Sequence, residues 1–405
     1  MTSLSIKQKA QQYVVLTGMA LFIGLLVGAI DMIFGQGLLL IGDFRSQHWP
    51  LILFLALAGL VIVYLYKRFG GKASKGMGLI FDVGHAREER IPLVLFPLIM
   101  LTTWMSHLFG GSVGREGVAV QIGATLSHRF ARHIKIPDAS RIFLMTGMAA
   151  GFAGLFQTPL AATFFALEVL TVGELQLMAL YPALIASIVA SFTSHALGLE
   201  KFAVPLKETL SWTPETLIKV ALLGLAFGLA GKLFAVSLSW LKKTVAKVLP
   251  NPYIRIAVIG AGLSLILLTL QLTKVGSYSG LGTNLIDVAF HQGSAQSYDW
   301  ILKLLFTVVT ISAGYQGGEV TPLFAIGATL GVFLAPLLGL PVLVVAAIGY
   351  ASVFGSATTT LLAPILIGGE VFGYGNLPFF VIACAIAYCL PKEWSIYSGQ
   401  KVAKK

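Results

Sequence analysis

Charged residues are scarce in this chain. Only 11% of its 405 residues are Asp, Glu, Lys or Arg, whereas a soluble domain carries about 25%. The stretch 320–369 contains none of the four. An ordinary soluble globular domain is therefore excluded.

Cysteine is scarce as well. The two cysteines, Cys384 and Cys389, lie in the last apolar segment. We expect them to pack as small apolar residues rather than to form a disulfide or a metal site. The sequence predicts no metal ion and no cofactor. A cleavable signal peptide is not expected either, because Tyr13–Ile30 is long for such a segment and lacks a clear small-residue cleavage site.

Apolar residues make up 57% of the chain, and many stand in runs near the roughly 20 residues that cross a bilayer. This pattern predicts an all-α polytopic membrane protein. Several apolar segments are too short to span a bilayer at 1.5 Å per residue. Helices are predicted near 13–34, 50–67, 91–109, 142–156, 158–171, 176–198, 217–241, 254–273, 300–314, 320–337, 341–355, 358–372 and 377–391.

Basic residues exceed acidic ones, and the net charge is +11. They gather between the apolar segments, for example at 67–75, 129–141 and 242–247. Such clusters are typical of cytoplasmic loops. We therefore expect contact with membrane lipid and no nucleic-acid partner, and Lys7 and Lys9 place the N-terminus in the cytoplasm.

The chain also contains an internal repeat. Gly114–Leu126 reads GREGVAVQIGATL, and Gly318–Leu330 reads GEVTPLFAIGATL. Farther along, two weaker matches both end in Glu-Val, at Glu168 and Glu370. An internal repeat in a membrane chain predicts a duplicated fold with an ion site between its halves.

The repeat and the polar stretches predict one transmembrane domain over 1–405. Its first half is expected at 10–198, a linker at 199–215 and its second half at 216–397. No cytosolic regulatory domain is expected.

Glu116 lies in the first copy of the repeat, at the expected start of a helix over 116–132. An ionisable residue within membrane sequence is costly and marks a functional candidate. A helix start attracts anions, because it presents free N–H groups and the positive end of the helix dipole. An ionised glutamate can occupy such a site and vacate it on protonation, which couples anions to protons. The alternative is a cap paired with Arg115.

The second copy places Glu319 and Thr321 at another helix start, with Pro322 in the first turn. Glu319 is a candidate proton carrier or a structural cap. The hydroxyl of Thr321 is a candidate ligand for a small ion or only a helix cap.

Three weaker signals stay open. Gly110-x-Ser112-x-Gly114 matches the nucleophile elbow of hydrolases, but the strand and the Asp and His partners of that motif are not apparent. Met77 stands in a Gly-Met-Gly stretch that fits a turn. Tyr397 is a candidate hydrogen-bond donor to an anion or an interfacial anchor.

Taken together, GSVGREG, QIGATL, FQTPLAATFFALEV, GGEVTPLFAIGATLG and ATTTLLAPILIGGEVFG resemble the CLC family of chloride channels and transporters. The resemblance runs from residue 70 to Tyr397. It implies a homodimer with one ion pathway per subunit. It also implies two inverted halves of broken, short and tilted helices, with anions bound where helix N-termini converge.

The resemblance also implies roles for single residues. Glu116 matches the gating glutamate, Tyr397 the tyrosine that coordinates the central anion, and Met77 a position that is serine in chloride-handling members. The remaining residues implied to line the anion path are Gly114, Arg115, Gly117, Val118, Val320 and Thr321.

Four departures set the chain apart from the common family pattern. Val118 replaces a proline, Met77 a serine and Val169 an inner proton-transfer glutamate, while Glu319 and Thr321 enter the second motif. These departures resemble the fluoride-transporting branch, which exports fluoride from bacteria in exchange for protons. The resemblance therefore implies a fluoride/proton antiporter, not an enzyme, in the inner (plasma) membrane. Glu116 and Glu319 are then the gating and proton-coupling residues.

Three other functions are alternatives. A chloride/proton exchanger or a passive chloride channel of the same family fits the shared motifs but not Met77 and Val169. A membrane-embedded hydrolase would act through Ser112. A secondary transporter for a larger anionic solute would be inhibited by small organic acids.

Overall fold

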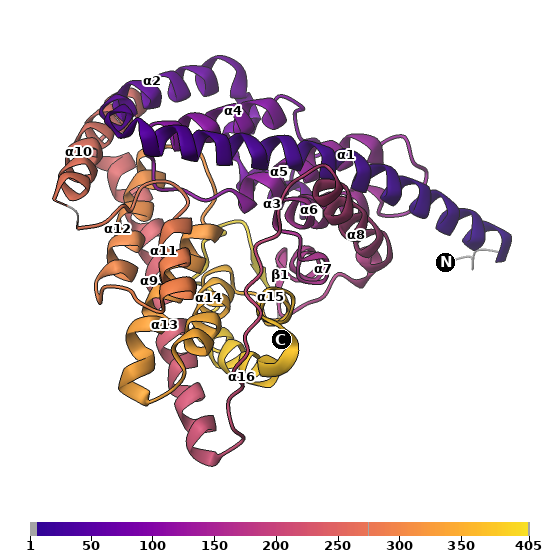
Figure 1. Ribbon diagram of the computed structural model, residues 1–405. Coiled ribbons are helices and arrows are strands. Elements are labelled where there is room, and N and C mark those ends of the chain that lie inside the picture. Colours follow the sequence, from indigo (N-terminus) through magenta and orange to yellow (C-terminus); the bar gives the residue numbers. More distant parts are fainter. Residues whose placement is uncertain (1–5, 274, 404–405) are drawn as a thin grey trace.

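The computed structural model describes residues 6–273 and 275–403, so the ends of the expected 1–405 domain lie outside it. The described chain is almost entirely helical (Figure 1). Two short strands, β1 (Thr171–Val172) and β2 (Lys401–Val402), pair in parallel. The α-helices are α1 (Ile6–Gln47), α2 (Leu55–Leu65), α3 (Met77–Gly84), α4 (Leu95–Leu108), α5 (Glu116–Ala131), α6 (Ala139–Phe156), α7 (Pro159–Glu168), α8 (Leu180–Ala196), α9 (Pro214–Val248), α10 (Pro252–Leu272), α11 (Thr283–Asp287), α12 (Asp299–Ala313), α13 (Val320–Leu338), α14 (Val342–Thr358), α15 (Leu362–Phe372) and α16 (Leu377–Tyr388).

The chain contains both helices that are long enough to cross a membrane and shorter helices. In the described part of the chain, 7 helices are long and apolar enough to cross a membrane. Shorter apolar helices are also present: α4 and α7 lie between these long helices in the chain, and α14 and α15 follow the last of them. The prediction of an all-α polytopic membrane fold with broken and short helices is confirmed.

Several predicted helices differ in extent from the observed ones, among them α9, which was predicted at 217–241. The segment predicted at 13–34 is the much longer α1, because Lys7 and Arg45 at its ends are helical although the apolar pattern stops short of them. The segment predicted at 50–67 is α2 between a 3-10 helix at Trp49–Phe54 and a π-helix at Tyr66–Gly70. Apolar pattern alone does not distinguish these helix types.

The two copies of the repeat form the same kind of helix crossing. A Cβ atom on Gly147 of α6 would lie 2.2 Å from the Gly123 oxygen of α5. A Cβ atom on Gly349 of α14 would lie 2.2 Å from the Gly327 oxygen of α13. Only glycine permits such close approach of two backbones. The long buried helices of each half are therefore fixed against each other by the same device.

The match continues where these helices end. Gln157 after α6 and Thr359 after α14 both adopt the left-handed conformation, with φ of 57° and 55°. This conformation is uncommon for residues other than glycine. Each break turns the chain into a short helix, α7 or α15, so the repeat seen in the sequence extends through three helices.

The two copies meet at their first glycines. The Gly114 N–H donates to the Gly318 oxygen at 2.5 Å, and the Gly318 N–H donates to the Gly114 oxygen at 2.7 Å. The bridge is antiparallel, and an antiparallel pair has a local two-fold axis. Two inverted halves are expected to meet in this way.

The stretch predicted as the linker, 199–215, is extended until α9 begins at Pro214. Its backbone binds to the end of α15, since Val204 N–H donates to the Val371 oxygen at 2.9 Å. In Figure 1 this segment runs down past α15 and α16 to the lower end of α9.

Candidate functional site

The candidate site is centred on Glu116, the first residue of α5. Its side chain is fully buried and points to the start of α13, which the Gly114–Gly318 bridge holds opposite. Glu116 Oε2 accepts the Thr321 N–H at 3.0 Å and the Thr321 hydroxyl at 2.5 Å. A carboxylate of one half is thus bound by the first donors of a helix from the other half.

Arg115 also lies beside this carboxylate. Its Nε atom is 3.6 Å from Glu116 Oε1, an oxygen that has no hydrogen-bond partner in the structure. The predicted alternative, a cap paired with Arg115, is present as this loose ion pair and as a long hydrogen bond from the Arg115 N–H to Glu116 Oε2 at 3.4 Å. The close hydrogen bonds of Glu116 go to Thr321.

The second glutamate, Glu319, lies directly before α13 and is half-buried. Its Oε2 is 3.7 Å from the position that a Cβ atom on Gly117 would take. The absence of a side chain at Gly117 therefore leaves room for this carboxyl group beside the first turn of α5. Val118 and Val320, which follow Gly117 and Glu319, are buried.

Tyr397 follows α16 and is only 5% exposed. Its ring centroid lies 5.3 Å from that of Phe81 in α3 and 6.4 Å from that of Phe165 in α7. Burial of this kind is incompatible with an interfacial anchor.

Met77 is the first residue of α3 and is half-buried against the core. A Cβ atom on its neighbour Gly76 would lie 3.3 Å from Gln121 Oε1. The start of α3 therefore lies beside α5, about one helical turn beyond Glu116.

Ser112 is placed in a way that contradicts the hydrolase alternative. Its side chain is fully buried, and the preceding element is α4 rather than a strand. Its Oγ atom lies 2.9 Å from Thr307 Oγ1 and accepts from Lys303 Nζ at 2.9 Å. A buried hydroxyl that is bound on both sides has no access to a substrate.

Sequence reasoning missed the roles of Glu168 and Glu370. Glu168 accepts three backbone N–H groups at the start of α15, from Leu361, Leu362 and Ala363, at 2.8 to 3.1 Å. Glu370 accepts the N–H groups of Leu160 and Ala161 at the start of α7, at 3.1 and 2.8 Å. The helix starts of α7 and α15 are thus already occupied by carboxylates. Their repeated Glu-Val was visible, but not which helix each glutamate would meet.

Lys303 was missed although the sequence carried a signal for it. It is fully buried in α12 and was the one charged residue of the predicted apolar segment 300–314. The same rule that singled out Glu116 applies to it. No group of three or more His, Cys, Asp or Glu that could hold a metal is found among the described residues.

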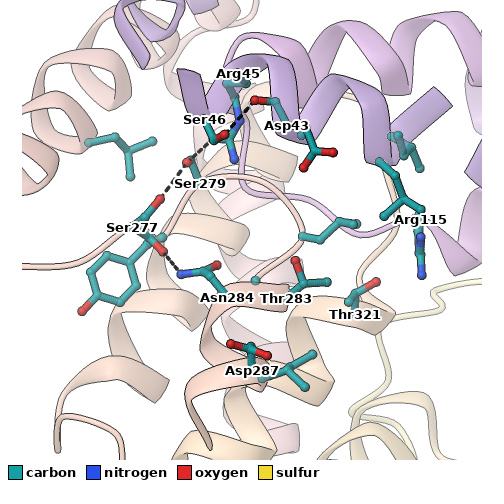
Figure 2. A pocket seen from close by; sticks show the side chains of 18 of the residues that line it. Asp43, Arg45, Ser46, Arg115, Ser277, Ser279, Thr283, Asn284, Asp287 and Thr321 are labelled. Atoms are coloured by element: carbon teal, nitrogen blue, oxygen red, sulfur yellow. Dashed lines mark hydrogen bonds between the residues drawn. The ribbon is translucent and has the colours of Figure 1, made fainter. Parts of the chain in front are cut away.

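A cavity of 690 Å³ leads to the site. Glu116, Thr321 and Arg115 line its inner end, and Tyr350 is part of its wall. Figure 2 shows Thr321 and Arg115 on one side of this cavity and Arg45 on another. The carboxylate of Glu116 therefore lies at the inner end of this cavity.

Comparisons with known proteins agree with this geometry. The family model described as voltage gated chloride channel matches residues 58–392. A chloride/fluoride channel protein of Pseudomonas syringae pv. tomato is 36% identical over 384 residues, which are 94% of this chain and 85% of that protein. The voltage-gated ClC-type chloride channel ClcB of Salmonella typhimurium is 26% identical over 70% of this chain and 69% of its own length.

Solved structures give the same picture. A crystal structure of a CLC-type fluoride/proton antiporter superposes with a TM-score of 0.94 at 50% identity, over 99% of this chain and 100% of that one. A slow cyanobacterial Cl⁻/H⁺ antiporter shares the fold, with a TM-score of 0.79 at 20% identity over 95% of this chain and 96% of that one. The chain is a multi-pass membrane protein and belongs to the voltage-gated chloride channel family, the CLC family.

Proposed function

We propose that this protein exchanges fluoride for protons across the inner membrane of a bacterium and thereby exports fluoride. The observation that carries the proposal is the pair of hydrogen bonds from Thr321 to Glu116 Oε2, at 3.0 and 2.5 Å. An N–H and an O–H group that converge on a carboxylate oxygen also suit a small anion. The 50% identity to a CLC-type fluoride/proton antiporter supports fluoride as that anion.

In this mechanism the ionised Glu116 closes the pathway by occupying the donors of Thr321. Protonation removes the charge of the carboxylate and weakens both hydrogen bonds, so the side chain moves aside. Fluoride then takes the same donors. The proton and the anion thus exclude each other at one place, which couples their movements in opposite directions.

Glu319 accompanies the proton in this proposal, since its carboxyl group lies beside Gly117 in the first turn of α5. Tyr397 donates its hydroxyl to an anion deeper in the path, and Met77 borders that path. Gly114 and Arg115, together with Val118 and Val320, form the remainder of the anion route. Val169 is fully buried and apolar, so the proton needs a route other than this position.

The protein is further proposed to work as a homodimer with a pathway in each subunit, and not as an enzyme. The halves 10–198 and 216–397 form one transmembrane domain joined by the linker at 199–215. Lys7 and Lys9 put the N-terminus in the cytoplasm. Because α1 crosses once, the cavity at its other end then faces outward.

A chloride/proton exchanger or passive chloride channel is the second candidate, supported by the 26% identity to ClcB channels. The test is ion efflux from proteoliposomes, with fluoride and chloride measured side by side and internal pH recorded. We expect fluoride efflux with proton uptake and little chloride efflux. Equal or greater chloride efflux would favour the second candidate.

The same assay on Glu116→Gln tests the mechanism. This variant keeps the shape of the side chain but cannot release or take up a proton at that position. We expect proton coupling to be lost, with anion flow either blocked or passive. Glu89→Gln, which alters an exposed loop glutamate, serves as the control and should remain coupled. Intact coupling in Glu116→Gln would overturn the proposal.

A further inference from the structure

The cavity outside Glu116 contains a cation that the proposed mechanism does not use. Arg45 lies in the last turn of α1 and lines the cavity. Its guanidinium donates one hydrogen bond, from Nη1 to Ser279 Oγ. Its Nε atom is buried and has no hydrogen-bond partner. Figure 2 shows Arg45 beside Ser279, across the cavity from Thr321 and Arg115.

A second cation, Lys303, lies against the loop that contains Tyr278 and Gly280. Lys303 Nζ donates to three neutral oxygens, those of Ser112 Oγ, Tyr278 O and Gly280 O, at 2.9, 3.3 and 2.8 Å. In the described part of the chain, neither Arg45 nor Lys303 forms an ion pair with a carboxylate.

The carboxylates of the cavity lie elsewhere. Asp287 pairs with His291 at 2.7 Å, and both side chains are more than 60% exposed. Asp43 also lines the cavity and is exposed. The inner carboxylate, Glu116, is bound by Thr321 and Arg115. None of these carboxylates is therefore paired with Arg45 or Lys303.

A half-buried arginine and a fully buried lysine without a carboxylate partner are costly in a membrane protein. A mobile anion in the cavity would reduce that cost, because Arg45 lines the cavity and no carboxylate pairs with its guanidinium. The low dielectric of the surrounding protein strengthens the attraction relative to open water. The geometry thus favours an anion beside Arg45.

We infer that this cavity contains a second anion site, in which a small inorganic anion binds to Arg45 between Glu116 and the solvent. The cavity of 690 Å³ admits the anion with part of its hydration shell, because a water molecule takes about 30 Å³. Arg45 therefore gathers the anion without dehydrating it, and dehydration is left to Thr321. The direction of flow through this site rests on the proposed function, whereas the binding itself does not.

The binding arm of the test is diffraction from crystals of the whole protein soaked in bromide, whose anomalous signal locates it. We expect a bromide peak beside Arg45 in the wild type. The peak should be absent in Arg45→Gln and retained in Arg45→Lys, which keeps the charge. Absence of the peak from the wild type, or its persistence in Arg45→Gln, would overturn the inference.

The transport arm measures fluoride flux against fluoride concentration on the cavity side. Arg45→Gln should raise the half-saturating concentration about threefold to tenfold and leave the maximal rate nearly unchanged, with the difference shrinking at high salt. Arg132→Gln removes the same charge from an exposed position outside this cavity and should match the wild type. An unchanged half-saturating concentration in Arg45→Gln counts against the site. If the wild type carries no fluoride, the proposed function fails and the bromide peak still decides the binding.

Discussion

Glu168 and Glu370 each close the N-terminus of the helix that carries the other. Glu168 ends α7 and binds the first N–H groups of α15, while Glu370 belongs to α15 and binds the first N–H groups of α7. Each carboxylate thus lies against the positive end of a helix from the opposite half. Contacts between a carboxylate and a helix N-terminus therefore join the two halves here, in addition to apolar packing.

Glu168→Gln is expected to lower the free energy of unfolding by about 1.5–3 kcal/mol, the usual contribution of hydrogen bonds to a charged group. Glu370→Gln should cost less, because Glu370 is more exposed and accepts two N–H groups rather than three. Thermal unfolding in detergent, followed by tryptophan fluorescence, measures both changes. Glu174→Gln alters an exposed glutamate nearby in sequence and should have little effect. Equal stability of Glu168→Gln and Glu174→Gln would contradict the role assigned to Glu168.

Gly147→Ala and Gly349→Ala are expected to be strongly destabilising. The added methyl group would lie 2.2 Å from a backbone oxygen of the facing helix in each case. A backbone oxygen cannot move aside by rotation as a side chain can, so the two helices have to move apart. Overpacking of this kind costs about 3 kcal/mol or prevents folding.

The matched control for these variants is Gly18→Ala in α1, where nothing lies within 4 Å of the new methyl group. Expression level and the monodisperse fraction in size-exclusion chromatography report all three variants. Gly18→Ala should behave like the wild type. Wild-type behaviour of Gly147→Ala would show that the α5–α6 crossing is looser than the structure indicates.

Thr321→Val removes the hydroxyl that reaches Glu116 Oε2 at 2.5 Å and keeps both the shape of the side chain and the backbone N–H donor. Under the proposed mechanism, fluoride loses the same donor. The fluoride transport rate should fall about tenfold or more, since a hydrogen bond to a charged group contributes about 1.5–3 kcal/mol.

Thr321→Ser retains the hydroxyl and should stay close to the wild-type rate. Proteoliposome flux at equal protein content distinguishes the two variants. If Thr321→Val transports as fast as Thr321→Ser, the hydroxyl is only a helix cap.

The centre of the site was predictable because its residues stand in short sequence patterns that can be recognised without the fold. Glu116, Glu319 and Thr321 stand at repeated helix starts, and the repeat pairs them without any knowledge of the fold. The all-α membrane class followed from the lack of charge. These predictions depend on patterns within about a dozen residues, which a sequence displays directly.

The periphery of the site was not predictable in the same way. Arg45 meets Ser279 across 234 positions of the chain, and no periodicity in either segment indicates that contact. The end of α1 also lies beyond the apolar stretch that marked its centre. Arg45 therefore fell outside the helix predicted at 13–34. The three-dimensional fold alone brings it beside the loop that covers Lys303.

The bridge between Gly114 and Gly318 is made entirely of peptide groups. Its two hydrogen bonds do not depend on the identity of any side chain, provided that both positions stay free of one. The residues that follow each glycine can therefore be exchanged without resetting the frame that presents them. An engineer who wished to change the preferred ion could keep Gly117 as glycine, vary the other residues of 115–118 and 319–321, and still find the two segments face to face.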